Sequence, residues 1–256
     1  MKVGGSVLTD KTSRETLDEA SFERVVDAVA RAREDDAADD AADDAAAGAV
    51  DDLVLVHGAG SFGHPHAAAH ALGEGGREGA FATHRAVSAL NRRFVDALDA
   101  AGVDALPVHP LSCAVRDDSL TMMTDQVGVM RDEGFVPVLH GDVVAHVDRG
   151  VSVVSGDALV VALVDALGDG RVGMCTAAGG VLDADGERLD AVGAVDEVPV
   201  LEGDDADDVT GGIRGKVERL LSLDGGGRVF GVDDLPRFLR GDDVGTLVED
   251  DAGGGT

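Results

Sequence analysis

Short runs of β-branched and other apolar residues alternate along the chain with longer segments whose apolar residues recur about every 3.6 positions. The short runs predict strands at residues 53–56, 105–108, 136–139 and 151–154. The longer segments predict helices at residues 21–33, 83–101, 157–167 and 215–223. Strands that alternate with helices are typical of a mainly parallel sheet covered by helices, so we expect an α/β fold.

One segment, residues 34–52, departs from this alternation. Its Asp-Asp-Ala-Ala repeat offers no apolar stripe that could be buried. We interpret it as an acidic low-complexity insertion, either a solvated extension of the preceding helix or a loose connection. The remaining sequence is consistent with a single domain over residues 1–256.

The charge balance is the unusual part of the composition. The chain has 50 acidic and 21 basic residues, which gives a formal net charge of -29. Self-repulsion at this charge destabilises a compact state unless counterions screen it, so we interpret the composition as a halophilic adaptation to a salty cytoplasm. Hydrophobic residues make up 44% of the chain and form recurring runs, which argues against a disordered acidic protein. The sequence has no basic patch to meet nucleic-acid phosphates, so we expect no nucleic-acid partner.

The cysteines and the apolar segments indicate where the protein works. Cys113 and Cys175 are expected to be buried and reduced, with a disulfide or a redox role as the alternatives. No basic segment followed by an apolar one marks an export signal, and the longest apolar stretch, residues 158–167, is interrupted by Asp165. We therefore expect a cytoplasmic protein that does not enter a membrane.

The segment VHGAGSFGHP, residues 56–65, follows the first predicted strand with a glycine pattern. Gly58, Gly60 and Gly63 fit G-x-G-x-x-G, in which bare backbone amides can approach a phosphate. A dinucleotide fold would also need an acidic residue at the end of a second strand about 20 positions later. Glu78 has that spacing but lies in a glycine-rich stretch, so the pattern indicates phosphate binding without indicating a dinucleotide.

Two further glycine-rich motifs contain all three lysines of the chain. The motif KVGGSVLTDK contains Lys2 and Lys11, and the motif DVTGGIRGK, residues 208–216, contains Lys216. Neither motif has the residue order of a Walker loop. A chain that uses arginine nearly everywhere else has kept lysine where a compact ammonium suits phosphate oxygens. The sequence therefore predicts a phosphate site built from lysines and glycine loops.

The histidines are candidates for other chemistry. His64, His66 and His70 would be the ligands of a metal site, and two of them would share a helix face. No cysteine or carboxylate with matching spacing lies nearby, so we expect no metal site. His57 and His140 each precede a glycine at a strand end, and we interpret both as packing or loop hydrogen-bonding residues.

Together with HGDVV (140–144) and SGDALVVAL (155–163), these motifs occur in the order seen in the amino acid kinase superfamily, which the chain resembles from Lys2 to about Gly231. The GSFGHP sequence is similar to that of isopentenyl phosphate kinases, and it also resembles that of fosfomycin kinases. The resemblance implies an open αβα sandwich with a mainly parallel central sheet, often dimeric. It also implies an acceptor-binding part over about 1–140 and a nucleotide-binding part over about 141–256.

The reaction implied by the resemblance is transfer of the γ-phosphate of ATP, with Mg²⁺, to isopentenyl phosphate in mevalonate-derived isoprenoid biosynthesis. Lys11 would stabilise the transition state, His64 would bind the acceptor phosphate, and Asp157 would orient the lysines. ATP would be bound by Lys2, Val3, Gly4, Gly5, Ser6, Gly60, Ala177, Gly212 and Lys216. The acceptor would be bound by Ala59, Gly63, His64 and Gly156, beside a helix that carries Thr83, His84 and Asn91.

Two features depart from the family pattern. The segment TAAGGV, residues 176–181, has Ala177 and Gly179 where the family usually has aspartates, so nucleotide binding is expected to differ. Lys2 directly follows Met1 although the family's lysine ends a central strand, and we expect the true start to lie upstream. The alternative functions are a phosphonate kinase of the fosfomycin type and a non-catalytic anion-binding or nucleotide-binding protein. The presence of Lys11 argues against a mere binder.

Overall fold

The computed structural model describes residues 1–40, 50, 52–69, 77–168, 170–199 and 212–250. The helices are α1 (Gly5–Leu8), α2 (Glu19–Asp40), α3 (Gly60–Ala69), α4 (Arg77–Ala100), α5 (Pro110–Cys113), α6 (Asp125–Asp132), α7 (Gly156–Leu167), α8 (Gly212–Leu221) and α9 (Leu235–Leu239). The strands are β1 (Lys2–Val3), β2 (Leu55–His57), β3 (Ala105–Pro107), β4 (Ala114–Arg116), β5 (Leu120–Met122), β6 (Val136–His140), β7 (Asp142–His146), β8 (Gly150–Val154), β9 (Gly173–Cys175), β10 (Ala191–Val192), β11 (Gly227–Phe230) and β12 (Thr246–Val248).

The main sheet has the strand order β10-β12-β11-β9-β1-β2-β6-β3. Its strands β11 and β12 are antiparallel, and the other neighbouring strands are parallel. The chain leaves β1 toward β2 on one side of the sheet and later returns to β9 on the other side. The order of strands therefore reverses at β1, and ligands of open α/β sheets bind at such a point, beyond the carboxyl ends of the strands.

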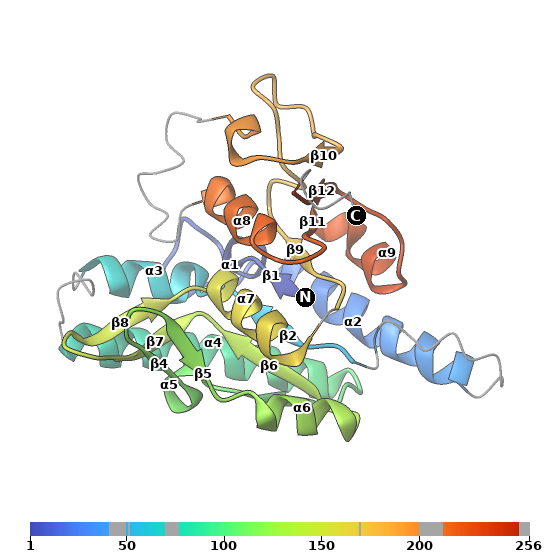
Figure 1. Cartoon of the computed structure of the whole chain (residues 1–256). Coiled ribbons are helices and arrows are strands. Elements are labelled where there is room, and N and C mark those ends of the chain that lie inside the picture. Colours follow the sequence, from blue (N-terminus) through green and yellow to red (C-terminus); the bar gives the residue numbers. More distant parts are fainter. Residues whose placement is uncertain (41–49, 51, 70–76, 169, 200–211, 251–256) are drawn as a thin grey trace.

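Helices cover both faces of this sheet (Figure 1). Leu55 and Val138 point to the core under α2 and α4, whereas Val56 and Leu139, the next residues on the same strands, point to the core under α7 and α8. Successive side chains of a strand alternate between faces, so residues buried on both sides read as the continuous apolar runs seen in the sequence. The expected α/β sandwich with a mainly parallel sheet is confirmed.

A second sheet, with the order β5-β4-β7-β8, adjoins the main one. A single residue, Gly141, separates the end of β6 from the start of β7, so the chain passes directly from one sheet into the other. The strand β8 was predicted over 151–154 and is present. The strands β4 and β5 have only three residues each, which is too short for the periodicity of apolar residues to reveal.

The predicted helices are present, each with slightly different ends, and one predicted strand is displaced. The run at 53–56 becomes a strand only from Leu55, because its neighbour β1 offers just Lys2 and Val3, which pair with Val56 and His57. The strand β1 pairs on both sides, with β2 and with β9. Helix α2 continues through Asp40, so the first part of the acidic segment is a helix extension, while 41–49 and 51 lie outside the described residues.

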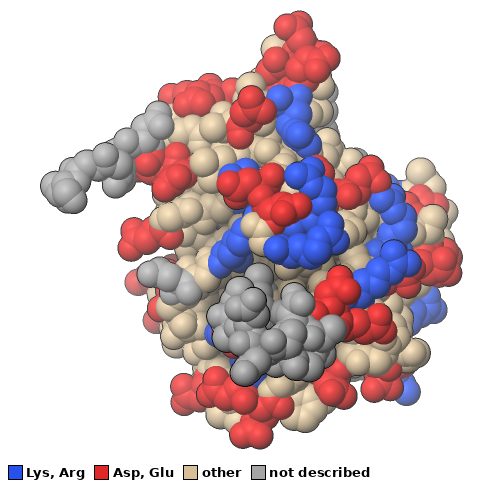
Figure 2. Space-filling model, turned by 90° about the vertical axis from the view of Figure 1, so that its right-hand side faces the viewer, with Lys and Arg blue, Asp and Glu red and all other residues tan. Residues whose placement is uncertain are grey.

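The surface combines the acidic excess with local clusters of opposite charge. Figure 2 shows Lys and Arg side chains gathered on one face of the molecule with acidic residues between and around them. Asp243 illustrates the mixture, because its Oδ1 atom lies 2.9 Å from the Arg228 guanidinium and 3.7 Å from that of Arg171.

Cys113 and Cys175 are both free and buried. Among the described residues, no helix is long and apolar enough to span a membrane.

Candidate active site

The three glycine-containing turns after β1, β2 and β6 lie side by side at the carboxyl edge of the main sheet. The amide of Gly58 donates to the carbonyl of Val3 at 2.9 Å, and the amide of Gly141 donates to the carbonyl of His57 at 2.9 Å. The amide of Gly4 donates to the last residue of β9 at 2.8 Å. These hydrogen bonds place the first and second sequence motifs, together with HGDVV, in a single row.

The first two motifs are in direct backbone contact. A Cβ atom built on Gly5 would lie 2.3 Å from the Gly60 nitrogen, and one built on Gly58 would lie 2.4 Å from the Gly5 nitrogen. Gly60 has a φ of +49°, and its own Cβ would lie 2.1 Å from the Thr9 hydroxyl oxygen. Only glycine fits where backbones approach this closely or where φ is positive. Part of the G-x-G-x-x-G pattern is therefore explained by packing between the two loops.

Two of the three lysines meet at Asp157. The Lys2 ammonium donates to Oδ1 of Asp157 at 2.5 Å, and the Lys216 ammonium lies 3.7 Å from Oδ2. Asp157 is 1% exposed and Lys2 is 5% exposed, so their pairing is shielded from solvent. Burial raises the pKa of Asp157, but the charges of Lys2 and Lys216 and the hydrogen bond from Lys2 outweigh it and hold the pKa below its ordinary value. The carboxylate is ionised. It fixes the ammonium group of Lys2, which belongs to β1, and that of Lys216, which belongs to α8.

Asp157 belongs to the first turn of α7, whose start is well defined. The Ser155 hydroxyl accepts a hydrogen bond from the amide of Ala158, which caps the helix. A Cβ atom on Gly156 would lie 3.2 Å from Cε of Lys2 and 3.3 Å from the His57 carbonyl oxygen. Glycine at this position therefore leaves room for the Lys2 side chain to reach Asp157, and the amide end of the helix adds positive potential there.

Lys11 lies apart from this cluster, exposed in the turn that follows β1 and α1. Polar contacts attach the loop that carries Lys11 to helix α3. The Ser61 hydroxyl donates to the Thr16 carbonyl at 3.1 Å, and a ring nitrogen of His66 lies 2.8 Å from the Glu15 carboxylate. The lysine loop and the helix that contains His64 are therefore held together.

The predicted acceptor residues surround the start of α3. Ala59 precedes the helix, and His64 is half-buried on it. A Cβ atom on Gly63 would lie 2.3 Å from the Ala59 Cβ and 3.0 Å from a methyl group of Val87 on α4. Gly63 thus permits close packing of α3 against α4, and its role toward an acceptor stays a prediction.

The remaining predicted nucleotide residues are spread around the same edge. Val3 is buried in the core, Ser6 is half-buried in α1, and Ala177 is exposed after β9. Gly212 begins α8 with a φ of +56°, and its carbonyl accepts a hydrogen bond from the Lys216 ammonium at 3.1 Å. Residues 208–211 of the third motif lie outside the described part of the chain.

Two buried histidines repeat one arrangement on neighbouring strands. His57 ends β2 and its Nδ1 lies 3.0 Å from the Gly58 carbonyl oxygen, while His140 ends β6 and its Nδ1 lies 3.1 Å from the Gly141 carbonyl oxygen. The two rings are stacked with their centroids 5.6 Å apart. The Nε2 of His57 lies 3.0 Å from the side-chain amide of Asn91 on α4. The expected loop hydrogen bonding by both histidines is present.

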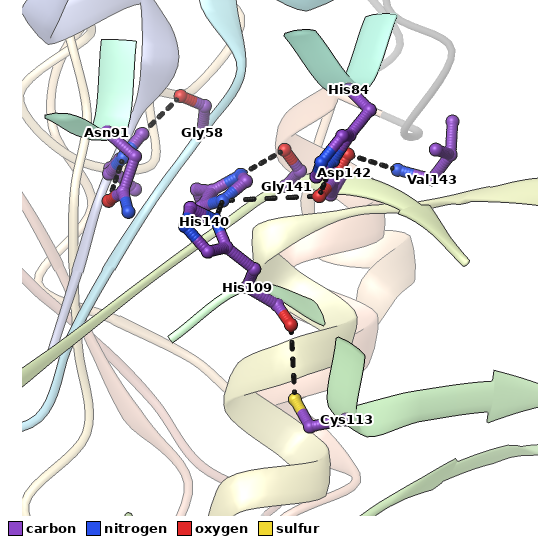
Figure 3. A network of polar contacts seen from close by, with 10 residues as sticks. Gly58, His84, Asn91, His109, Cys113, His140, Gly141, Asp142 and Val143 are labelled. Atoms are coloured by element: carbon purple, nitrogen blue, oxygen red, sulfur yellow. Dashed lines mark hydrogen bonds and ion pairs between the residues drawn. The ribbon is translucent and has the colours of Figure 1, made fainter. Parts of the chain in front are cut away.

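A network of further polar side chains continues from His140 (Figure 3). Its Nε2 lies 2.9 Å from Nδ1 of His109 and 4.0 Å from Oδ2 of Asp142. The same Asp142 oxygen lies 2.8 Å from Nδ1 of His84, and the other carboxylate oxygen accepts the Val143 amide at 2.7 Å. Sequence reasoning did not single out His109 or Asp142. The only signal for Asp142 was its place after the strand-end His-Gly pair.

Burial sets the protonation of this network. Burial lowers the pKa of His57 and, together with the neighbouring charge of His57, lowers that of His140 well below its ordinary value. Burial raises the pKa of Asp142 to about 6, although the Val143 amide and His84 counteract it. His57 and His140 are therefore neutral near pH 7.

The described residues contain no group of three His, Cys, Asp or Glu placed to hold a metal ion, and His70 lies outside them.

Comparison with known proteins shows the family to which the chain belongs. The model of the amino acid kinase family matches residues 1–228. The isopentenyl phosphate kinase of Haloferax volcanii is 44% identical over 255 residues, which are 97% of each chain. That of Methanothermobacter thermautotrophicus is 34% identical over 87% of this chain and 85% of its own. An X-ray structure of an isopentenyl phosphate kinase has a TM-score of 0.79 at 28% identity and covers 97% of this chain and 98% of the other. The chain belongs to the amino acid kinase family and, within it, to the isopentenyl phosphate kinases.

Proposed function

We propose that the protein transfers the γ-phosphate of ATP to isopentenyl phosphate and so forms isopentenyl diphosphate. The similarity to isopentenyl phosphate kinases over nearly the whole chain supports the reaction. The observation that carries it in the structure is the buried Asp157, which fixes Lys2 and Lys216 at the carboxyl edge of the sheet. A carboxylate that holds two ammonium groups in place pre-organises positive charge for a polyanion.

The donor side of the site is built for phosphate oxygens. Transfer between two phosphates brings negative charges together, so positioning and charge neutralisation dominate the catalysis. Lys2 and Lys216 supply the charge, and the backbone amides of Gly5 and Gly60 supply hydrogen bonds with no side chain in the way. The acceptor oxygen is already largely ionised, and therefore no strong base is required.

On the acceptor side, His64 hydrogen-bonds the acceptor phosphate beside the backbones of Ala59 and Gly156. Lys11 neutralises charge on the phosphoryl group during transfer. The attachment of its loop to α3 supports this assignment, because it ties the position of Lys11 to that of His64.

Mg²⁺ bound with ATP would neutralise charge on the β- and γ-phosphates. Asp157 directs both of its oxygens to lysines, and the described residues contain no group of three His, Cys, Asp or Glu placed to hold a metal ion. The ion would therefore be bound by phosphate oxygens and water molecules, and it would need no ligand from the protein. The mevalonate-derived pathway and the homodimer implied by the resemblance belong to the same proposal, as does the cytoplasmic location expected from the sequence.

Phosphorus NMR in molar KCl, with ATP, Mg²⁺ and isopentenyl phosphate, tests the function. We expect a new diphosphate signal, and we expect His64→Ala to slow its appearance greatly. His66→Gln is the matched control, since His66 lies on the same helix and a Gln amide can still donate a hydrogen bond to Glu15. If the folded protein gave no signal with isopentenyl phosphate but phosphorylated fosfomycin, the proposal would be wrong and the phosphonate alternative right.

A further inference from the structure

The repeated histidine arrangement on β2 and β6 has a fixed proton position. A carbonyl oxygen can only accept a hydrogen bond, so the nitrogen facing it must carry the hydrogen. This holds for Nδ1 of His57 against Gly58 and for Nδ1 of His140 against Gly141. Both rings are fully buried and neutral, and each therefore has a bare Nε2 that must accept.

Each bare nitrogen has a donor supplied by another element. His109 donates its Nδ1 hydrogen to Nε2 of His140. The Asn91 amide fits against His57 in two orientations, and with its oxygen toward His57 its nitrogen has no partner within the described part of the chain. Turning the amide places its NH₂ group against Nε2, which gives the Asn91 nitrogen an acceptor and the His57 nitrogen a donor. Asn91 and His109 therefore hold the two histidines in the same tautomer.

The Gly58 carbonyl belongs to the peptide that continues to Ala59, a predicted acceptor residue, and the Gly141 carbonyl belongs to the peptide that continues to Asp142. A trans peptide directs its carbonyl and its amide hydrogen to opposite sides. Fixing the Gly58 carbonyl on His57 therefore aims the Ala59 amide hydrogen away from His57. A Cβ atom on Gly141 would lie 3.6 Å from the Ala59 nitrogen and 3.4 Å from the Gly156 nitrogen, so these amides flank the space above Gly141.

We propose that His57 and His140 are positioning residues that act as Nδ1–H tautomers. His57 holds the Gly58 peptide so that the Ala59 amide faces the acceptor phosphate. His140 holds the Gly141 backbone, which packs beside the Ala59 and Gly156 amides. Asn91 and His109 act one step further out by keeping Nε2 of each ring unprotonated. This inference rests on the proposed function and deepens it, because it assigns a role to residues that do not touch the substrate.

Matched substitutions of His57 separate this role from simple packing. An Asn side chain places its amide nitrogen close to the position of Nδ1, whereas a Gln side chain places its nitrogen close to that of Nε2. Both variants remove the ring that packs against Phe94 and His140. We expect the KM for isopentenyl phosphate to rise about tenfold more in His57→Gln than in His57→Asn, because only Gln leaves the Gly58 carbonyl without its donor. The same order is expected for His140→Gln and His140→Asn.

A spectroscopic measurement on the wild type does not depend on any variant folding. Nitrogen NMR of protein labelled with ¹⁵N-histidine should show His57 and His140 as Nδ1–H tautomers at pH 7. Either ring in the Nε2–H form would overturn the proposal, and so would equal acceptor KM values for the Asn and Gln variants of an active enzyme. A folded wild type without turnover would instead refute the proposed function, which keeps the two failures distinct.

Discussion

Lys2 and Asp157 are 155 positions apart in the chain, yet the Lys2 ammonium lies 2.5 Å from a carboxylate oxygen of Asp157 in a site closed to solvent. The contact links the first strand to the start of α7. Lys216, from α8, reaches the other oxygen of the same carboxylate. Two of the charges that we propose to bind phosphate, those of Lys2 and Lys216, are thus joined by one residue.

Replacing Asp157 by Asn should impair both folding and turnover. Breaking a buried ion pair leaves an uncompensated charge, and we expect the free energy of unfolding to fall by about 3 kcal/mol. We also expect kcat to fall about a hundredfold, because the two lysines lose their anchor. Denaturant titration and steady-state kinetics in molar KCl measure these effects. Asp165→Asn, on the exposed side of the same helix, should change neither. Equal losses in both variants would contradict the special role of Asp157.

Lys11→Ala should separate catalysis from stability. Lys11 is exposed, so we expect almost no change in Tm, while kcat should fall at least about a hundredfold because charge on the transferring group is no longer neutralised. Lys11→Arg keeps the charge but changes its geometry, and an intermediate kcat is expected. Turnover equal to that of the wild type in Lys11→Ala would remove Lys11 from the mechanism.

Asp142 should make the stability depend on pH in an unusual direction. Its pKa rises from an ordinary value of 3.8 to about 6 in the folded protein. Between these values the folded state holds a proton that the unfolded state has lost, so the contribution of Asp142 to stability falls as pH rises. The contributions of the other titratable groups to the pH dependence cancel when the stability of the wild type is compared with that of Asp142→Asn. The wild type should lose stability relative to the variant from pH 4 to pH 7 in denaturant titrations, and the opposite trend would refute the assignment.

Gly5→Ala should disrupt the contact between the first two motifs. The added methyl group would lie 2.3 Å from the Gly60 nitrogen, which is backbone and cannot move without displacing α3. We expect a loss of stability of about 2 kcal/mol or more and a loss of activity. Gly128→Ala on α6 is the control, because the nearest atom to its methyl group is 3.9 Å away. That variant should be neutral or slightly stabilised in thermal unfolding.

Raising the KCl concentration should stabilise the protein. Its net charge of -29 causes self-repulsion that salt screens, and the screening length falls to about 3 Å at 1 M. We expect Tm to rise steadily between 0.1 M and 2 M KCl. A Tm that is independent of salt would contradict the interpretation of the acidic composition as a halophilic adaptation.

The fold could be predicted from the sequence where its signals are local. Helix α7 and the strands around Val56 and Val138 bury continuous apolar runs, so they were recognisable. The strands β4 and β5 were not, because three residues carry no measurable period. The backbone contact of Gly5 with Gly60 was also hidden, since glycines that bind phosphate and glycines that pack closely look alike in sequence.

The candidate site was predictable only in part, for a similar reason. The scarcity of lysine pointed to Lys2, Lys11 and Lys216, and the family resemblance pointed to Asp157. The pairing of His109 with His140 depends on two residues 31 positions apart, on elements whose approach no sequence period encodes. Polar networks of this kind become visible only once the strands and helices are placed.

The contact of Gly5 and Gly58 with the neighbouring loop also constrains how the enzyme can change its substrate. In the proposed function one of these loops faces the nucleotide and the other faces the acceptor, and their backbones have no space between them. Main-chain geometry would consequently set the distance between the γ-phosphate of ATP and the phosphate of the acceptor. Under the proposed function, new acceptors would be accommodated by exchanging side chains on α4 beyond the phosphate, while the distance over which the phosphoryl group travels would stay the same.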